Sequence, residues 1–416
     1  MTAHTEATAA DGAHEGSVIR RTWLFLPLFA PFGISAGYVS VTLGFILGKA
    51  GLPIAAIGVL VALSVWPQTW KVLWAPIVDT TGNPKLWYGL GAVLTGLAIL
   101  AMSAIKADAG SIPFLKILIV ISSIASTLVS MSTEIFMAHF VPQAAQGRAS
   151  GWGQAGNLGG SGIGGGIGLL LAEHVAMPWV SGLVLALICI GCWGAVTLLP
   201  PAPRGHRHER YLDSLKNVAL DVWSVAKSRL GYLALIIMLL PIASGGAQGL
   251  WSAVASEWRA DANLVALVNG VMGGLVMALG CLLGGYVCDK MDNKAAYALF
   301  GIAAGIVAVL MGWSPRTPTM FVAGTLGYAL AVGMGYAAYN AIVLEAIGKG
   351  AAATKFNLLA AVSNIPIAVM TEFDGWMHDE HGTMAMLYGE LALPAATIAV
   401  FFLFVAATRS RKAATG

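Results

Sequence analysis

Two charged side chains lie inside long apolar runs of this sequence. Lys71 is eighteen residues past Pro53 in a run that extends to residue 78, and Glu134 occupies a similar depth in the run 113–141. At a rise of about 1.5 Å per residue, Lys71 lies roughly 27 Å along a helix that starts at Pro53. A charge in hydrocarbon costs about 2.5–3.5 kcal/mol at the centre of a bilayer, so such a side chain usually faces a cavity or a partner. We therefore predict that Lys71 and Glu134 contact each other.

Aromatic and amide side chains in these and other apolar runs could line the same cavity. Trp66, Trp70 and Trp74 recur every four residues, which predicts one helical face. That face is either an aromatic wall for a substrate or ordinary packing at the membrane interface. The predicted cavity-lining residues are Trp70, Trp74, Gln154, Asn157, Gln248, Trp251, Asn340, Asn357 and Asn364. A single buried amide can equally bridge two helices, so that alternative stays open for each.

The stretch TEFDGWMHDEH concentrates acids and imidazoles. Its titratable side chains are Glu372, Asp374, His378, Asp379, Glu380 and His381. Carboxylates mixed with imidazoles could bind a metal or shuttle protons. The sequence shows no fixed ligand spacing, so we interpret the stretch as solvated loop polarity and predict no metal and no cofactor.

Composition indicates the elements that carry these residues. The chain has 416 residues, of which 57% are hydrophobic and only 10% charged, whereas soluble domains are about a quarter charged. A membrane crossing needs about 20 apolar residues. The sequence offers twelve such runs, at about 22–46, 53–78, 86–105, 113–141, 152–173, 178–200, 230–256, 262–287, 295–313, 318–345, 356–377 and 385–408.

The distribution of lysine and arginine predicts the orientation of these crossings. With the N-terminus inside, seventeen of these residues fall on the inner side and five on the outer side. This asymmetry places both termini in the cytoplasm. The net charge of +3 therefore reflects topology, and no nucleic-acid partner is predicted.

Residues 201–229 are the one long polar interruption, between the sixth and seventh runs. Their apolar residues recur three or four apart, which is typical of an amphipathic helix lying on the inner membrane surface. The predicted organisation is a cytoplasmic tail 1–21, a six-helix bundle 22–200, an amphipathic linker 201–229, a second six-helix bundle 230–408 and a tail 409–416.

The two predicted bundles resemble each other in sequence. The second run ends APIVDTTGNPK and the eighth ends GGYVCDKMDNK, while QGRASGWGQAGNL opens the fifth and KGAAATKFNLLAAVSN leads into the eleventh. Two parallel six-helix repeats describe the major facilitator architecture, which binds its substrate between the halves near the membrane midplane. We predict an all-α polytopic membrane protein of this fold, with 12 transmembrane helices in two pseudo-symmetric bundles.

The motifs WKVLWAPIVD, QGRASG and AAATKFNLLAAVSN resemble one branch of that superfamily. This branch contains the AmpG muropeptide permeases and acetyl-CoA transporters, with the related siderophore permeases of the rhizobactin and pyochelin type. The resemblance implies a proton-driven permease of the bacterial inner membrane that imports a bulky, often anionic metabolite. Many AmpG-like members carry two acids near the inner end of helix four, whereas this sequence has Glu134 and places Ala138 where the second is expected. That departure leaves the substrate class open.

Facilitators use the loop after helix two as a gating latch, and the resemblance extends this role to four residues. Asp79 and Asp289 end the second and eighth runs, and Lys290 follows Asp289. An acid at such a position caps a neighbouring helix or meets an arginine, and Arg148 is the partner available to Asp79. Ordinary loop polarity is the alternative interpretation.

These residues suggest one transport mechanism and two alternatives. Lys71 would bind an anionic group of the substrate and pair with Glu134 when the site is empty, and protonation of Glu134 would couple uptake to the proton gradient. Alternatively, Lys71 extends to the lipid headgroups and Glu134 only neutralises it. The predicted partners are a small molecule, protons and the bilayer, and we expect a monomer. A facilitator or exporter of small metabolites or drugs, or a membrane sensor without transport, remains possible.

Other classes find no support in the sequence. There is no G-x-x-x-x-G-K-[ST] loop for direct use of ATP and no H-E-x-x-H motif for metal-dependent hydrolysis. The G-x-S-x-G match GISAG at residues 33–37 lies inside the first apolar run and lacks the strand–turn–helix context of a hydrolase nucleophile, so an enzyme is not predicted. Residues 152–168 contain nine glycines, which predicts close helix approach. They lack the Gly-Pro pair of drug/proton antiporters.

Overall fold

The computed structural model describes residues 21–80, 83–200, 216, 219–220, 223, 226–347 and 359–415. This part of the chain is helical and contains no strand. Its α-helices are α2 (Phe25–Gly37), α3 (Gly44–Lys49), α4 (Ile54–Trp70), α5 (Ala75–Thr80), α6 (Pro84–Ala104), α7 (Ile112–Phe140), α8 (Gln143–Gly162), α9 (Gly168–His174), α10 (Trp179–Trp193), α12 (Arg229–Leu239), α13 (Ala262–Val265), α14 (Gly273–Cys288), α15 (Asn293–Trp313), α16 (Pro318–Ile347), α18 (Asn364–His381) and α19 (Thr383–Thr415).

Shorter helical turns interrupt or extend these helices. The 3₁₀ turns are η1 (Thr22–Leu24), η3 (Lys71–Leu73), η4 (Ala109–Ser111), η6 (Gly194–Leu198), η7 (Gly246–Gly249) and η8 (Ala255–Trp258). Three π-helical segments are η2 (Tyr38–Leu43), η5 (Ile163–Ile167) and η9 (Ala266–Met272).

Nine helices of the described part are long and apolar enough to cross a membrane, and they match nine of the twelve predicted crossings. They are Thr22–Lys49, Ile54–Leu73, Pro84–Ala104, Ala109–Phe140, Trp179–Leu198, Ala262–Cys288, Asn293–Trp313, Pro318–Ala346 and Thr383–Ala406. The predicted crossing 152–173 lies in the glycine-rich run of α8, η5 and α9, and the crossing 356–377 ends in the acidic α18. Both are helical where described but are less apolar than a typical span.

The prediction of one continuous helix over 230–256 is wrong. The helix α12 ends at Leu239, and the chain from there to residue 258 forms no α-helix but short turns, among them η7 and η8. Pro241 supplies no backbone N–H and disfavours helix at the residue before it. Gly245 has a φ of +69°, a left-handed conformation that glycine adopts without steric cost. Non-helical backbone at membrane depth is tolerated where it is buried in protein or lines a cavity, and Leu250 is fully buried here.

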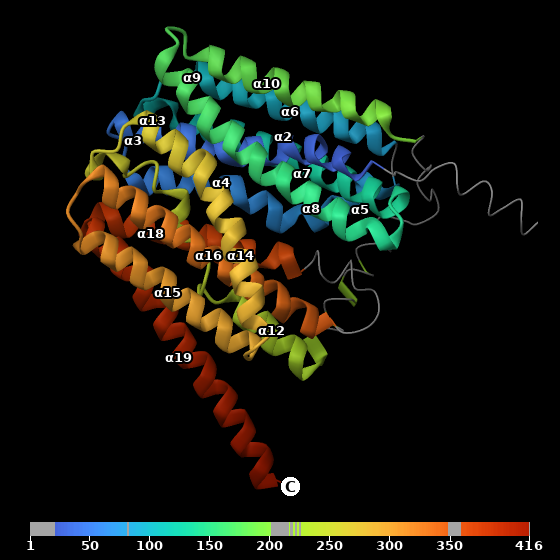
Figure 1. The fold of residues 1–416 in the computed structure, drawn as a ribbon, viewed down its shortest axis with the longest axis vertical. Helices are drawn as coiled ribbons and strands as arrows, with labels where there is room; N and C mark the ends of the chain where they lie inside the picture. The colour runs from blue at the N-terminus through green and yellow to red at the C-terminus, as the bar shows by residue number, and fades with distance from the viewer. Residues whose placement is uncertain are drawn as a thin grey trace, which may run out of the picture.

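The helices form two groups with matching internal contacts. Figure 1 shows the blue-to-green helices on one side of the molecule and the yellow-to-red helices on the other. In the N-terminal group (α2 to α10), the packed pairs include α2 with α8, α4 with α7, α6 with α7 and α6 with α10. In the C-terminal group (α12 to α19), the corresponding pairs are α18 with η7, α14 with α16, α15 with α16 and α15 with α19. Each N-terminal pair has a counterpart in the C-terminal group, formed by the helices six crossings further along the chain, as the predicted repeat requires.

The repeat also appears in how helices begin. The side chain of Asn83 caps α6 by accepting a hydrogen bond from the Lys85 amide at 2.9 Å. Asp292 caps α15 by accepting from the Lys294 amide at 3.1 Å. Capping oxygens satisfy amides that have no partner within the helix. The sequence similarity between GNPK and MDNK therefore reflects two equivalent helix caps.

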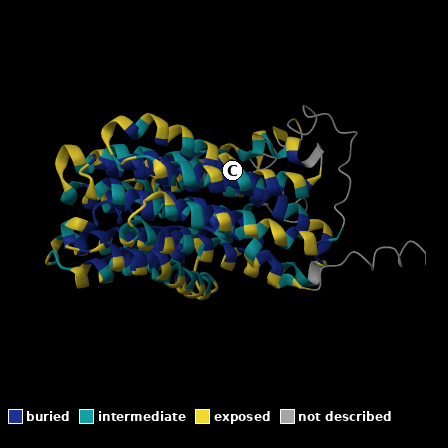
Figure 2. Ribbon diagram, turned by 90° about the horizontal axis from the view of Figure 1, so that it is seen from above, coloured by how far each residue is buried: buried dark blue, intermediate teal, exposed yellow. Residues whose placement is uncertain are grey.

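The two groups contact each other through α4 with α18 and through η5 with η9. A Cβ added to Gly270 would lie 2.7 Å from the backbone of Gly166, so the glycine-rich segment does permit close approach. Figure 2 shows buried residues through the interior of the helix layers and exposed ones mainly along the outside. Among the exposed apolar side chains are Leu275, Leu282 and Leu403, at 68%, 75% and 70% exposure, as expected of a lipid-facing surface.

Candidate functional site

Lys71 and Glu134 form an ion pair between α4 and α7. The Lys71 Nζ lies 3.5 Å from the Glu134 Oε1, and the two side chains are 19% and 34% exposed. The predicted contact between these charges is therefore confirmed. Both partners keep part of their side-chain surface exposed. Whether the pair serves transport stays a prediction.

A break in the helix positions Lys71. The helix α4 ends at Trp70, Lys71 begins the 3₁₀ turn η3, and the Trp74 amide donates to the Lys71 carbonyl at 3.2 Å. Proline inside a helix clashes with the carbonyl four residues earlier but is tolerated in a first turn. Pro67 lies inside α4, whereas Pro76 is the second residue of α5 and so occupies a first turn, where proline causes no clash. The break sets the ammonium at a helix end, facing α7.

The three tryptophans of this region do not share one environment. The Trp66 Nε1 donates to the Glu372 Oε1 of α18 at 3.1 Å, across the two helix groups. The Trp74 Nε1 donates to the Thr127 Oγ1 of α7 at 3.0 Å, within the N-terminal group. The interpretation of a single aromatic face is wrong for Trp74, because the turn η3 ends the regular periodicity of α4.

The remaining predicted cavity residues fall in several environments. Trp70 is 52% exposed, Gln154 is exposed, and Asn157, Gln248 and Asn340 are half-buried. Their role as cavity-lining residues stays a prediction.

Two of the other predicted cavity residues are engaged inside the protein, and one is not described. Trp251 is only 2% exposed and packs edge-on against Tyr328, with ring centroids 5.4 Å apart. Its predicted place on a cavity wall is therefore wrong, because the broken segment turns its indole into the core. The Asn364 Nδ2 donates to the Ala360 carbonyl at 3.2 Å. Asn357 lies outside the described residues.

The predicted gating residues lie near helix ends. Asp289 and Lys290 are exposed after α14, and the Lys290 ammonium lies 3.9 Å from the centroid of the Tyr286 ring. Arg148 is exposed in α8, and the side chain of Asp79 is outside the described part. Their gating role stays a prediction.

The acidic stretch that ends α18 is not a solvated loop, which corrects our interpretation of it. Asp379 accepts hydrogen bonds from the amides of Ile54 at 3.0 Å and Ala55 at 2.8 Å. It therefore caps α4 of the opposite helix group. The His378 Nε2 lies 2.6 Å from Glu257, and the Arg316 guanidinium lies 3.5 Å from the same carboxylate. Within the described residues, no group of three or more potential ligands could hold a metal ion.

Two of these groups lie just beyond the predicted crossings and have shifted pKa values. Burial lowers the pKa of His378, but hydrogen bonds to Glu257 and Asp379 outweigh it and raise that pKa overall. Burial raises the pKa of Glu257, but hydrogen bonds from His378 and Thr383 and the charge of Arg316 outweigh it and lower that pKa overall. Both shifts favour the charged pair.

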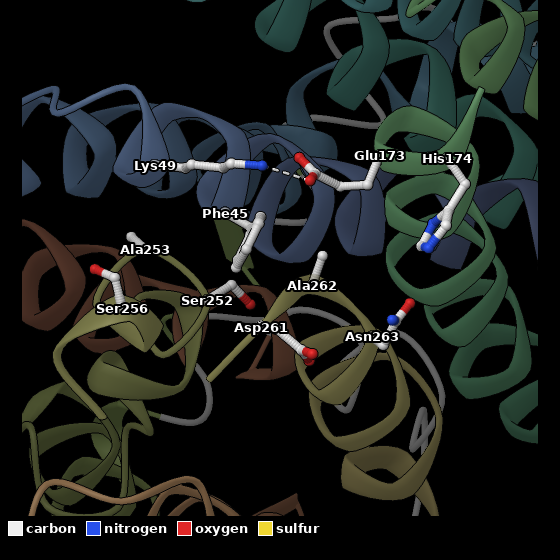
Figure 3. A pocket seen from close by; sticks show the side chains of 10 residues that line it. All are labelled: Phe45, Lys49, Glu173, His174, Ser252, Ala253, Ser256, Asp261, Ala262 and Asn263. Carbon is white, nitrogen blue, oxygen red and sulfur yellow. Dashed lines mark hydrogen bonds and ion pairs between the residues drawn. The ribbon is translucent and has the colours of Figure 1, made fainter. Parts of the chain in front are cut away.

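A cavity of about 350 Å³ lies between the two groups at the end where α4 begins, which is the predicted outer end. Figure 3 shows the Lys49 ammonium pointing at Glu173 of the N-terminal group, with Asp261 and Asn263 of the C-terminal group across from them. The Lys49–Glu173 distance is 2.5 Å. This cavity is at the opposite end from Lys71 and Glu134, so it does not contain the predicted site.

The sequence matches the Major Facilitator Superfamily over residues 24–371, which is most of the chain. The chain belongs to the Major Facilitator Superfamily. It is therefore a multi-pass membrane protein of a transport family.

Relatives within the superfamily are distant. The anhydromuropeptide permease of Escherichia coli (strain K12) is 23% identical over 325 residues, covering 75% of this chain and 65% of the permease. The chain thus spans about two-thirds of that relative. The nucleoside transporter NupG has a TM-score of 0.68 at 14% identity, covering 92% of this chain and 98% of NupG. A D-xylose-proton symporter has a TM-score of 0.66 at 14% identity, covering 90% of this chain and 95% of the symporter. The two solved structures establish likeness of fold alone.

Proposed function

We propose that this chain is a secondary active transporter that takes up a bulky polar or anionic metabolite with protons, by alternating access. The observation that carries the proposal is the partly exposed Lys71–Glu134 ion pair at a break in α4. Charged side chains at such positions in membrane proteins usually mark substrate or ion pathways. The names of two relatives support it, one an anhydromuropeptide permease and the other a D-xylose-proton symporter.

In this mechanism Lys71 exchanges partners. An anionic group of the substrate takes the place of Glu134 at the ammonium, and a proton on Glu134 removes the competing negative charge. The substrate and the proton then favour each other, because each makes the other's binding less costly. Muropeptides, CoA esters and siderophore-like compounds all carry carboxylate, phosphate or similar anionic groups that this lysine could bind.

The contacts between the two helix groups support access from one side. The hydrogen bonds of Asp379 to the start of α4 lie at the predicted outer end, and the hydrogen bond of Trp66 to Glu372 lies four residues before the end of α4. Lys71 and Glu134 lie nearer the other end. We assign this arrangement to an inward-facing state of a monomer in the inner membrane of a bacterium, with both termini cytoplasmic.

Transport into proteoliposomes tests the proposal. Labelled anhydromuropeptide, acetyl-CoA and a ferric siderophore are offered with the vesicle lumen alkaline, and then with equal pH on both sides. We expect one class to accumulate against its gradient only when the proton gradient is present. Uptake that equilibrates without accumulation would support a facilitator instead. No transport of any compound, in protein that binds one of them, would support a sensor.

A further inference from the structure

A second pair of acids is buried in the C-terminal group, away from Lys71. Asp374 of α18 has no exposed surface, and Glu390 of α19 is 4% exposed. The two carboxyl groups contact neighbouring residues of one turn, because Asp374 packs against Gly246 and Glu390 accepts from the Ala247 amide. Each lies seven residues from the end of its helix, or about 10 Å inside the predicted outer end. Two acids at this depth need an explanation, because a buried charge without a partner is strongly unfavourable.

Glu390 has hydrogen-bond donors for both of its oxygens. Its Oε1 accepts from the Ala247 amide at 3.2 Å, and its Oε2 accepts from the Tyr328 hydroxyl. The Ala247 amide belongs to η7, the turn within the broken seventh segment. Two donors directed at one carboxylate stabilise its ionised form. Glu390 is thus hydrogen-bonded through both oxygens and anchors the broken segment.

Asp374 has the opposite environment. Neither carboxyl oxygen has a hydrogen-bond partner, and both are fully buried. Gly246 packs against it so closely that an added Cβ would lie 2.8 Å from the Asp374 Oδ2. A carboxyl group without donors beside another acid is favoured in its neutral form. A proton on Asp374 would give the pair the donor that it lacks and leave one negative charge for two acids.

The surrounding titratable groups do not supply a cation. Tyr328 of α16 faces the two acids. The other titratable side chains on the surrounding helices have partners of their own. Glu372 of α18 accepts from Trp66. Arg316 and His378 pair with Glu257 nearer the predicted outer end. Within the described part of the chain, no lysine, arginine or histidine forms an ion pair with Asp374 or Glu390.

We propose that Asp374 and Glu390 together form a proton-binding site that holds one exchangeable proton and controls the contact between α4 and α18. With the proton bound, α18 stays against η7 and α19. Without it, two negative charges repel across this packing, and α18 moves away from the broken segment. Because α18 also carries Glu372 and Asp379, which bind α4, loss of the proton would open the predicted outer end. This inference rests on the proposed function.

Infrared spectroscopy tests the proton directly and needs no substrate. In the purified protein in lipid at neutral pH, we expect a carbonyl band of a buried protonated carboxyl that shifts in D₂O. The band should disappear in Asp374→Asn and persist in Glu345→Gln, a control in the partly exposed ion pair between Lys294 and Glu345. An unchanged spectrum in Asp374→Asn would overturn the site. Asp374→Glu should restore the band if the asparagine variant is poorly folded.

Transport assays test the coupling separately. Asp374→Asn is neutral permanently, so uptake driven by a proton gradient should fall at least about tenfold, within the usual range of coupling between two sites. Counterflow, which needs no net proton movement, should be retained. If driven uptake and counterflow fall together, the site is structural and the coupling is refuted. A sodium gradient that drives uptake, with a band that sodium removes, would show a cation site instead. If the wild-type protein shows the band but transports nothing, the proposed function fails while the proton site stands.

Discussion

Removal of the Lys71 ammonium separates a transport role from a structural one. At the observed distance of 3.5 Å, two unit charges attract by about 5 kcal/mol at an effective dielectric constant of about 20. Both side chains are partly exposed, at 19% and 34%, so their attraction is weaker than that of a fully buried pair. We expect a coupling free energy of about 1–2 kcal/mol, between the values of exposed and buried pairs.

The variant Lys71→Met keeps the aliphatic stem and removes the charge. If the ammonium binds an anionic substrate, the same 1–2 kcal/mol corresponds to a KM about 5- to 30-fold higher. Lys71→Arg keeps the charge with a different donor geometry and should be affected less. Lys294→Met is a matched control, because Lys294 lies 3.2 Å from Glu345 with exposures of 15% and 36%. Its KM should stay at the wild-type value.

The double variant Lys71→Met with Glu134→Gln decides between the two roles. Removing both charges relieves the unpaired carboxylate, so thermal stability should return toward the wild-type value. Uptake at equal membrane expression should remain impaired, because the substrate anion still lacks its cation. Wild-type uptake by the double variant, or by Lys71→Met alone, would refute the proposed role of this lysine.

Three further predictions concern the contact between the helix groups. Gly270→Ala should lower thermal stability and uptake, because its Cβ would lie 2.7 Å from the backbone of Gly166, whereas at Gly159 a Cβ meets nothing within 4 Å. Equal stability of Gly270→Ala and Gly159→Ala would contradict this close packing. Trp66→Phe removes one hydrogen bond between the groups, worth about 1 kcal/mol, so solvent labelling of the predicted outer end should rise about fivefold. Unchanged labelling would show that this bond does not help to keep the outer end closed. The pKa of His378 is raised, so its bonds contribute fully below about pH 6.5 and are lost as the pH rises through the raised value. Labelling should therefore increase in alkaline solution in the wild-type protein and not in His378→Gln, and a pH dependence that persists in His378→Gln would contradict this.

The sequence contained enough to predict the pairing of Lys71 with Glu134. Both are charges in apolar runs at similar depth, and the cost of burying either alone strongly restricts where they can lie. The helices themselves follow from run length, so nine crossings agree with the expected positions. Pro76 is compatible with the start of a new helix at α5, but the separation of Trp74 from Trp66 could not be predicted from the sequence.

The broken seventh segment and the buried acids could not be found in the same way. Residues 240–258 are apolar enough to read as a helix, and the left-handed Gly245 becomes visible only in the backbone. Asp374 belongs to a stretch with several other polar residues, which favours a loop interpretation. Glu390 is a lone acid in an apolar helix, and the rule that identified Lys71 would have identified it too. Its neighbour Asp374 could not be predicted, because that requires knowing which helices pack together.

The two charged sites lie in different helix groups, and one contact connects the elements that carry them. Lys71 follows Trp66 by five residues, at the end of the same helix, and Asp374 follows Glu372 by two residues on α18. The hydrogen bond from Trp66 to Glu372 therefore joins α4, which ends beside the first site, to α18, which carries the second. Coupling between sites requires an element with two arrangements that both sites influence. The packing of α4 on α18 fulfils this requirement, because substrate at Lys71 acts on the end of α4 and a proton at Asp374 acts on the position of α18. A change at either site then alters the same contact, which is how binding of an anion and of a proton could favour each other across the two halves.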